Sequence, residues 1–108
     1  MARLDREHPR ATVEPVAHGS GTTVVAIVGE LDMASVEDVE GEVDAIIETA
    51  PDRLTFDLSR VTFMDSSGIA MLIRAANRVA FVEVRDPSPI VQMIIQATGL
   101  SEVLHAGL

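Results

Sequence analysis

The residues best suited to chemistry lie in one short segment, Asp57 to Ile69, which contains two carboxylates and three serines. Within it, Asp65 is followed directly by Ser66 and Ser67, where apolar residues begin to recur at helical spacing. The first amides of a helix lack intrahelical partners, and the helix dipole places partial positive charge there. A serine at this position can carry a phosphate that the helix tolerates, or it can simply cap the helix. The residues alone leave both interpretations open.

A hydrolytic site is a second chemical possibility, with Ser66 as nucleophile and Asp57 or Asp65 as the orienting carboxylate. No histidine lies near the segment, and the segment contains no Gly-x-Ser-x-Gly elbow. A histidine could approach only from elsewhere in the chain, as His18 or His105. We therefore expect that the protein is not an enzyme, with hydrolysis as the weaker alternative.

Composition argues against several other kinds of site and partner. The 108 residues include 17 Asp and Glu against 8 Lys and Arg, a net charge of −9, so we expect no direct binding to nucleic acid. There is no Cys, and the three His lack the spacing of metal ligands, so we expect no metal and no cofactor. Without a Gly-rich phosphate loop and its Lys, ATP is expected to act only from a partner's active site.

Length and hydrophobicity suit one folded domain, since 47% of the 108 residues are hydrophobic. The first ten residues are charged and contain Pro9, so we expect residues 1–10 to be a mobile tail and residues 11–108 to be the domain. The tail lacks the apolar stretch of a secretory signal, and apolar runs such as Val24 to Val28 are far shorter than the ~20 residues that cross a bilayer. We expect a soluble, cytoplasmic protein with no direct membrane insertion.

The pattern around the segment predicts alternating strands and helices. Strands are expected at Ala11 to Ala17, Thr22 to Val28, Arg53 to Leu58 and Val79 to Val84, with a final extended piece that includes Val103 and Leu104. Helices are expected to begin after Ser35, at Ser66 and at Pro89, and to end before Pro51, at Asn77 and at Gly99. Pro15 confines the first strand to a sheet edge, and Ser59 to Asp65 is expected to be a short loop. This alternation favours an α/β fold with a mainly parallel sheet of four to five strands and helices packed against it.

Finer expectations concern the two helices that flank the second central strand. Ser35 followed by Asp38 predicts a weak capping box, and Asn77 is expected to end its helix in the left-handed conformation. Arg74 and Arg78 are expected either to be solvated or to contact an acidic patch.

Three segments together resemble the signature of the STAS domain family, named for sulphate transporters and anti-sigma factor antagonists. They are Asp57 to Ile69 with its Asp65-Ser66-Ser67-Gly68 helix entry, Gly29-Glu30-Leu31-Asp32, and Ser88-Pro89 followed by an apolar helix that ends at Gly99-Leu100. The segments occur in the family's order and span nearly the whole chain from about Thr12. The resemblance implies a STAS-like fold.

The free-standing bacterial members of the family are anti-sigma factor antagonists, so the resemblance implies regulation of transcription by partner switching in a stress response. The serine directly after the motif's aspartate is the usual phosphoacceptor, here Ser66, with Ser67 as the alternative. A partner that is both anti-sigma factor and ATP-dependent serine kinase phosphorylates it, and a separate phosphatase reverses the reaction. The unphosphorylated protein binds and sequesters the anti-sigma factor. The implied partner-binding residues are Asp32, Asp65, Ser66, Ser67 and Gly68.

A different role on the same fold stays open, as a non-catalytic STAS subunit of a larger signalling or membrane-lipid transport assembly. Ser66 would then be a structural cap, and an apolar surface near Met64, Ile69 and Met71 would be a permanent interface. One departure from the family pattern bears on the partner. The connection Ala75 to Phe81 is about one helical turn shorter than usual and lacks a Gly-rich turn.

Overall fold

The computed structural model describes residues 11–19, 21–102 and 104–107, so the expected tail, residues 1–10, lies outside the described residues. Five strands form one sheet in the order β1-β2-β3-β4-β5. The strands are β1 (Ala11–Gly19), β2 (Thr22–Leu31), β3 (Arg53–Met64), β4 (Phe81–Arg85) and β5 (His105–Gly107). The helices are α1 (Val36–Ile47), α2 (Ser66–Ala76) and α3 (Pro89–Thr98), followed by the short 3-10 helix η2 (Leu100–Glu102).

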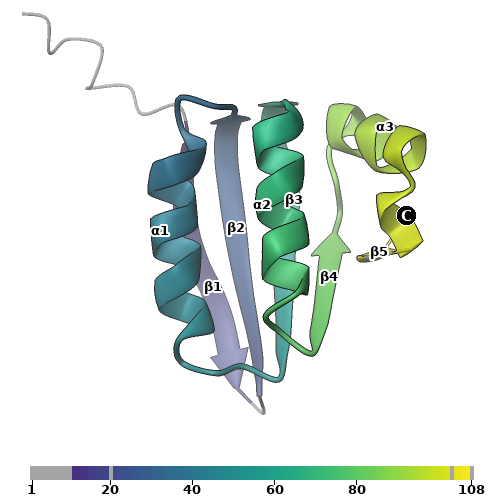
Figure 1. Cartoon of the computed structure of the whole chain (residues 1–108). Coiled ribbons are helices and arrows are strands. Elements are labelled where there is room, and N and C mark those ends of the chain that lie inside the picture. Colours follow the sequence, from purple (N-terminus) through teal and green to yellow (C-terminus); the bar gives the residue numbers. More distant parts are fainter. Residues whose placement is uncertain (1–10, 20, 103, 108) are drawn as a thin grey trace, which may run out of the picture.

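The sheet is mixed and mainly parallel, as the sequence predicts. β1 is an edge strand that runs antiparallel to β2, while β2, β3, β4 and β5 pair in parallel. Figure 1 shows α1 and α2 side by side over one face of the sheet, with α3 near the β4 end. The carboxyl ends of β2 and β3 and the first turns of α1 and α2 therefore meet at one edge, here called the carboxyl edge (Figure 1).

The core contains apolar residues of the sheet and of all three helices, and the part between the sheet and α1 and α2 positions the carboxyl edge. Leu54, Phe56 and Leu58 of β3 are fully buried and alternate with residues on the opposite face of the strand. The helices contribute apolar residues that recur every three or four positions: Val39, Val43 and Ile47 from α1, and Met71, Leu72 and Ala75 from α2. Burial of one continuous apolar layer fixes where both helices begin relative to the strands.

The expected loop at residues 59–65 is wrong, because β3 continues to Met64. Twice along this stretch β3 advances by one residue more than β2: Asp57 to Arg60 faces Ala26 to Val28, and Val61 to Phe63 faces Gly29 to Glu30. Each extra residue is a bulge that breaks the alternation of apolar and polar side chains. A bulged strand therefore has the residue pattern of a loop, although its pairing with β2 persists.

Asp57 stabilises the first bulge. Its Oδ1 accepts hydrogen bonds from the Ser59 backbone N–H at 3.0 Å and from the Ser59 hydroxyl at 2.7 Å. The side chain of an aspartate can accept a hydrogen bond from the backbone N–H two residues later. It then replaces the backbone acceptor that a neighbouring strand would otherwise supply. Asp57 therefore has a structural role at a point where the ladder is irregular.

The end of α2 and the strand after it differ from expectation in detail. α2 ends at Ala76, but Asn77 is right-handed, with φ −82°, because its N–H continues the helical turn toward the carbonyls of Ile73 and Arg74. β4 begins at Phe81, two residues later than predicted. The final strand is His105–Gly107, with Leu104 buried just before it, while Val103 lies outside the described residues.

α3 begins and ends as predicted, with Pro89 in its first turn and Gly99 left-handed at φ 75°. Ser88 does not cap the helix through its side chain. Its hydroxyl instead donates to the Val61 carbonyl at 2.7 Å, and its N–H donates to the Leu58 carbonyl at 3.1 Å. Two hydrogen bonds from Ser88 thus hold the start of α3 against the bulged part of β3.

Candidate functional site

The start of α2 is capped by Asp65. Its backbone is extended, and its Oδ1 accepts a hydrogen bond from the Ser67 N–H at 2.8 Å. Ser66 is the first helical residue and is exposed, and within the described part of the chain its hydroxyl has no hydrogen-bond partner. Ser67 is half-buried. Of the two sequence interpretations of Ser66, a structural cap is wrong, because the neighbouring carboxylate performs that role.

The same carboxylate joins α2 to the loop between β2 and α1. Asp65 Oδ2 accepts a hydrogen bond from the Met33 N–H at 3.2 Å, and the Asp65 N–H donates to the Leu31 carbonyl at 3.2 Å. The segments that contain Asp32 and Ser66 therefore lie side by side at the carboxyl edge, although 32 residues separate Met33 from Asp65.

Asp32 holds its own loop in a closed turn. Its Oδ1 accepts hydrogen bonds from the Ala34 N–H at 3.0 Å and the Ser35 N–H at 3.1 Å. Ser35 is buried, and its hydroxyl donates to the Glu30 carbonyl at 2.7 Å. The capping box expected from Ser35 and Asp38 is wrong, because the hydroxyl turns back to β2 and makes no bond to the helix.

Gly68 is a packing residue of the site. It is buried in the first turn of α2, and a Cβ atom there would lie 2.9 Å from both Leu31 Cγ and Met64 Cγ. Only a residue without a side chain lets α2 approach the ends of β2 and β3 this closely. Gly68 therefore determines how closely the start of α2, which contains Ser66, approaches the ends of β2 and β3. It has no side chain with which to contact a partner.

Neither of the histidines in the described backbone lies near Ser66. His18 stands level with Leu54 across β2, and His105 stands level with Thr55 across β4. Both positions are at the far end of β3, about 30 Å from Met64 at the strand spacing of ~3.3 Å per residue. A serine-histidine pair built from these residues is therefore excluded.

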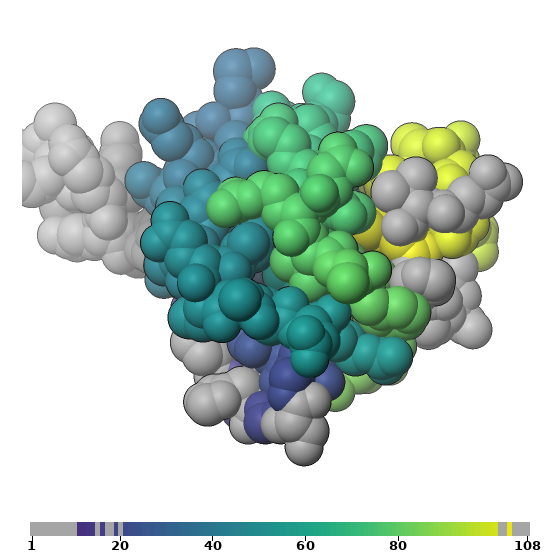
Figure 2. Space-filling model, turned by 60° about the horizontal axis from the view of Figure 1, so that its bottom comes forward, coloured from purple at the N-terminus to yellow at the C-terminus, as the bar shows by residue number. Residues whose placement is uncertain are grey.

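A cavity lies at that same far end. Its volume is about 410 Å³, and its lining residues come from the β1–β2 turn and the α1–β3 connection: Gly19, Gly21, Thr22, Thr23, Ile46, Thr49, Ala50 and Pro51. Figure 2 shows this end of the molecule. The lining contains no titratable side chain, so the cavity has no acid or base for catalysis.

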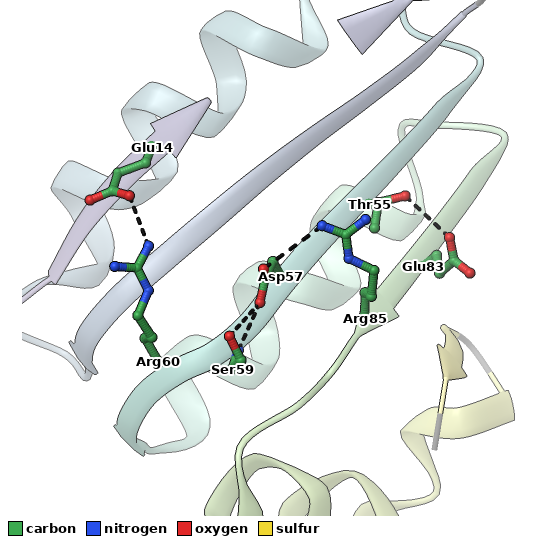
Figure 3. A network of polar contacts seen from close by, with 7 residues as sticks. All are labelled: Glu14, Thr55, Asp57, Ser59, Arg60, Glu83 and Arg85. Carbon is green, nitrogen blue, oxygen red and sulfur yellow. Dashed lines mark hydrogen bonds and ion pairs between the residues drawn. The ribbon is translucent and has the colours of Figure 1, made fainter. Parts of the chain in front are cut away.

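The face of the sheet opposite α1 and α2 carries a network of paired polar groups (Figure 3). Three contacts involve β3: Arg85 with Asp57 at 3.8 Å, Glu83 with Thr55 at 3.2 Å, and Arg60 with Glu14 at 2.9 Å. Burial raises the pKa of Asp57, but its hydrogen bonds from Ser59 and the two nearby arginines outweigh burial, so this pKa lies below its usual value. The polar side chains drawn in Figure 3 therefore have hydrogen-bond or ion-pair partners within the chain.

Arg74 and Arg78 also have intramolecular partners. Arg74 makes a bidentate contact with Glu40, with both N–O distances at 2.7 Å, and Arg78 contacts Asp44 at 2.6 Å. The hydrogen bond from Arg74 lowers the pKa of Glu40. Both arginines are exposed, as expected for a solvated face, and both also contact an acidic patch, which is the adjacent face of α1.

The apolar surface expected near Met64, Ile69 and Met71 is wrong. Met64 is 4% exposed and Met71 is 1% exposed, because both side chains belong to the core, and Ile69 is partly buried against it. The large exposed apolar side chains near the site are Met33 (76%) and Phe63 (44%) instead. Sequence reasoning missed Met33, although its position two residues before Ser35 in a turn was a usable signal, since turns lie at the surface.

Among the described residues, no helix is long and apolar enough to span a membrane. No group of three or more His, Cys, Asp or Glu side chains is arranged to hold a metal ion in the same part of the chain.

Comparison with known proteins places this geometry in a family. The STAS domain family model matches residues 14–107. An anti-sigma F factor antagonist of Lysinibacillus sphaericus is 30% identical over 84 residues, which are 73% of this chain and 72% of the relative. The anti-sigma-F factor antagonist RsfB of Mycobacterium tuberculosis is 28% identical over 71 residues, 66% of this chain but only 58% of RsfB.

A solved structure agrees with these relatives. The crystal structure of an anti-sigma factor antagonist from Mycobacterium paratuberculosis is 27% identical, has a TM-score of 0.81, and matches 89% of this chain and 84% of its own. The residues matched by the family model, 14–107, run from within β1 to the end of β5. This chain belongs to the STAS domain family.

Proposed function

We propose that this protein is a cytoplasmic, non-enzymatic anti-sigma factor antagonist that binds an anti-sigma factor when Ser66 is unphosphorylated. The names of its relatives support the class of partner. The observation that best supports a phosphorylation switch is the exposed Ser66 hydroxyl. It has no hydrogen-bond partner in the described chain, because Asp65 caps α2. A free hydroxyl on a helix that the neighbouring Asp65 caps is accessible to a kinase without loss of a structural hydrogen bond.

Charge explains how phosphorylation ends binding. A phosphate on Ser66 adds about −1.5 to −2 charges at neutral pH, next to Asp65 and close to the loop of Asp32. The helix terminus stabilises such a charge by about 0.3 to 1 kcal/mol, so the domain stays folded. An interface built around a neutral hydroxyl instead buries an unmatched charge at a cost of several kcal/mol, and each 1.4 kcal/mol is tenfold in affinity.

Ser66 is the better acceptor of the two adjacent serines. Ser66 is exposed, whereas Ser67 is half-buried and its N–H is bonded to Asp65. In the proposed cycle the partner is an anti-sigma factor that is also an ATP-dependent serine kinase, and a separate phosphatase removes the phosphate from Ser66. Asp32, Asp65 and Gly68 shape the surface that the partner reads.

The test uses purified candidate anti-sigma kinases from the source organism, with ATP and mass spectrometry to locate phosphate. We expect phosphate on Ser66 of the wild type and of Ser67→Ala, and none on Ser66→Ala. In calorimetry, Ser66→Ala should bind the kinase that modifies the wild type, while Ser66→Asp should bind at least about tenfold more weakly.

Equal affinity of the unphosphorylated and the stoichiometrically Ser66-phosphorylated protein would contradict the proposal. Absence of phosphate with every kinase, together with stable co-purification in a complex, would favour a non-catalytic subunit of a signalling or membrane-lipid transport assembly.

A further inference from the structure

The loop that presents Met33 is held rigid by its own hydrogen bonds. Asp32 Oδ1 accepts from the N–H groups of Ala34 and Ser35, and the Met33 N–H is bonded to Asp65 Oδ2. The Ser35 hydroxyl, donated to Glu30, fixes the other side of the turn. The Met33 side chain is nevertheless 76% exposed. A large apolar group on a fixed backbone loses little backbone entropy when it enters a pocket.

A second apolar side chain lies on the next strand. Phe63 is 44% exposed, and it stands two residues before Asp65 at the end of β3, level with Glu30 of β2. Met33 and Phe63 therefore extend from the same two strand ends that position Ser66. Methionine adapts to irregular apolar pockets, and aromatic side chains are enriched at the centres of interfaces.

Acidic residues predominate in the sequence around these two residues, and the flanking Arg60 and Arg74 are paired with Glu14 and Glu40. The stretches 30–42 and 61–73 contain acidic residues but no Lys or Arg. Glu37 and Asp38 in the first turn of α1 are exposed, and Asp32 and Asp65 lie at the base of the loop. A partner surface that covers Met33 must therefore place basic or neutral groups around an apolar pocket, because like charges at an interface are unfavourable.

We propose that Met33 is an apolar anchor that enters a pocket bordered by Arg or Lys on the anti-sigma factor, with Phe63 packing at its margin. This inference rests on the proposed function and adds to it the residue that determines affinity. The Met33 backbone N–H is bonded to Asp65, the residue directly before Ser66, so one partner surface covers both the hydroxyl and the methionine. α3 offers the contrast: Met93 is 63% exposed, but that helix carries no charged residue and its start is fastened to β3 through Ser88.

The experiment compares Met33→Ser with Met93→Ser in the full chain. The probe is the purified kinase that phosphorylates Ser66 of the wild type, and calorimetry measures its affinity for each unphosphorylated protein. We expect Met33→Ser to bind at least tenfold more weakly and Met93→Ser to bind within twofold of the wild type. Thermal unfolding should leave both variants within about 2 °C of the wild type, since both side chains are exposed.

A loss within twofold for Met33→Ser, or equal losses for both variants, would overturn the anchor while the proposed function stands. Absence of Ser66 phosphorylation in the wild type with every kinase would overturn the proposed function, and the anchor with it. Phe63→Ser gives a second measure, with an expected loss between those of the two methionine variants. Higher salt should weaken wild-type binding, because the pocket's border is basic.

Discussion

The carboxyl edge and the sheet face opposite α1 and α2 both carry polar residues, but the two regions use them differently. On the sheet face, Asp57, Arg60 and Arg85 each contact a partner within the chain (Figure 3). At the carboxyl edge, Asp65 bonds backbone amides of two segments, and the side chains of Ser66 and Met33 stay exposed. The polar groups of the sheet face already pair with one another, so they gain little binding energy from a partner. At the carboxyl edge, an ordered backbone exposes a hydroxyl and an apolar side chain, which suits it to binding.

The two regions also differ in the interactions that stabilise them. The sheet-face contacts are between partly exposed side chains, which typically contribute about 0 to 1 kcal/mol each. The carboxyl edge depends on two buried residues. Gly68 packs closely against Leu31 and Met64, and the Ser35 hydroxyl donates a hydrogen bond to the Glu30 carbonyl. Substitutions of Gly68 or Asp65, which hold the carboxyl edge together, should therefore cost more stability than substitutions on the sheet face.

Gly68→Ala should have the largest effect. The added Cβ would lie 2.9 Å from Leu31 Cγ and Met64 Cγ, so α2 must shift away from the strands, at a cost of about 1 to 3 kcal/mol. Urea denaturation measures the change. The matched control is Gly41→Ala in α1, where no atom lies within 4 Å and where alanine should stabilise the helix by up to about 1 kcal/mol. Equal effects of the two variants would show that Gly68 does not set the helix position.

Asp65→Ala should have the second largest effect, a loss of about 0.5 to 2 kcal/mol in the free energy of unfolding. It removes the cap from the Ser67 N–H and the bond to the Met33 N–H. Amide hydrogen exchange at Ser67 and Met33 should accelerate in this variant. Asp65→Asn keeps an acceptor and should lose less. Unchanged exchange at Met33 would show that Asp65 does not hold the β2–α1 loop against the start of α2.

Asp57→Asn should change the acid response of the protein. Because the pKa of Asp57 is lower in the folded chain, its contribution to stability is complete above the unfolded pKa and is lost as pH falls through the folded pKa. The wild type should therefore lose more stability than the variant between about pH 5 and pH 3. Denaturation midpoints at several pH values measure this. Parallel curves for the two proteins would mean that the Asp57 charge contributes nothing to the sheet face.

Arg60→Gln should have the smallest effect, a loss of at most about 1 kcal/mol. The Arg60 and Glu14 side chains are 58% and 51% exposed, so solvent and salt screen their contact. Thermal unfolding at low and high salt measures the loss, which should disappear in high salt. A loss larger than that of Asp65→Ala would reverse the order of the two regions.

Much of the fold could be predicted from local patterns. Apolar residues at three- and four-residue spacing placed α2 and α3, and the Pro89 and Gly99 signals marked the ends of α3. The second half of β3 could not be predicted, because its two bulges interrupt the strand alternation and exist only in pairing with β2. Asn77 was misjudged for a similar reason, since the backbone after it continues a right-handed turn.

At the candidate site, the sequence by itself determined the residue types: an acceptor carboxylate, two hydroxyls and a glycine at the start of one helix, on an acidic chain without Lys. Only the tertiary structure decided their roles. Asp65 caps α2 and reaches Met33, which leaves the Ser66 hydroxyl free, and Gly68 fits against Leu31 and Met64. The physical reason is distance along the chain. Local propensity acts within a few residues, whereas the contacts of Asp65 with Met33 and of Gly68 with Leu31 join segments more than 30 residues apart, which meet only because two parallel strands end at the same edge.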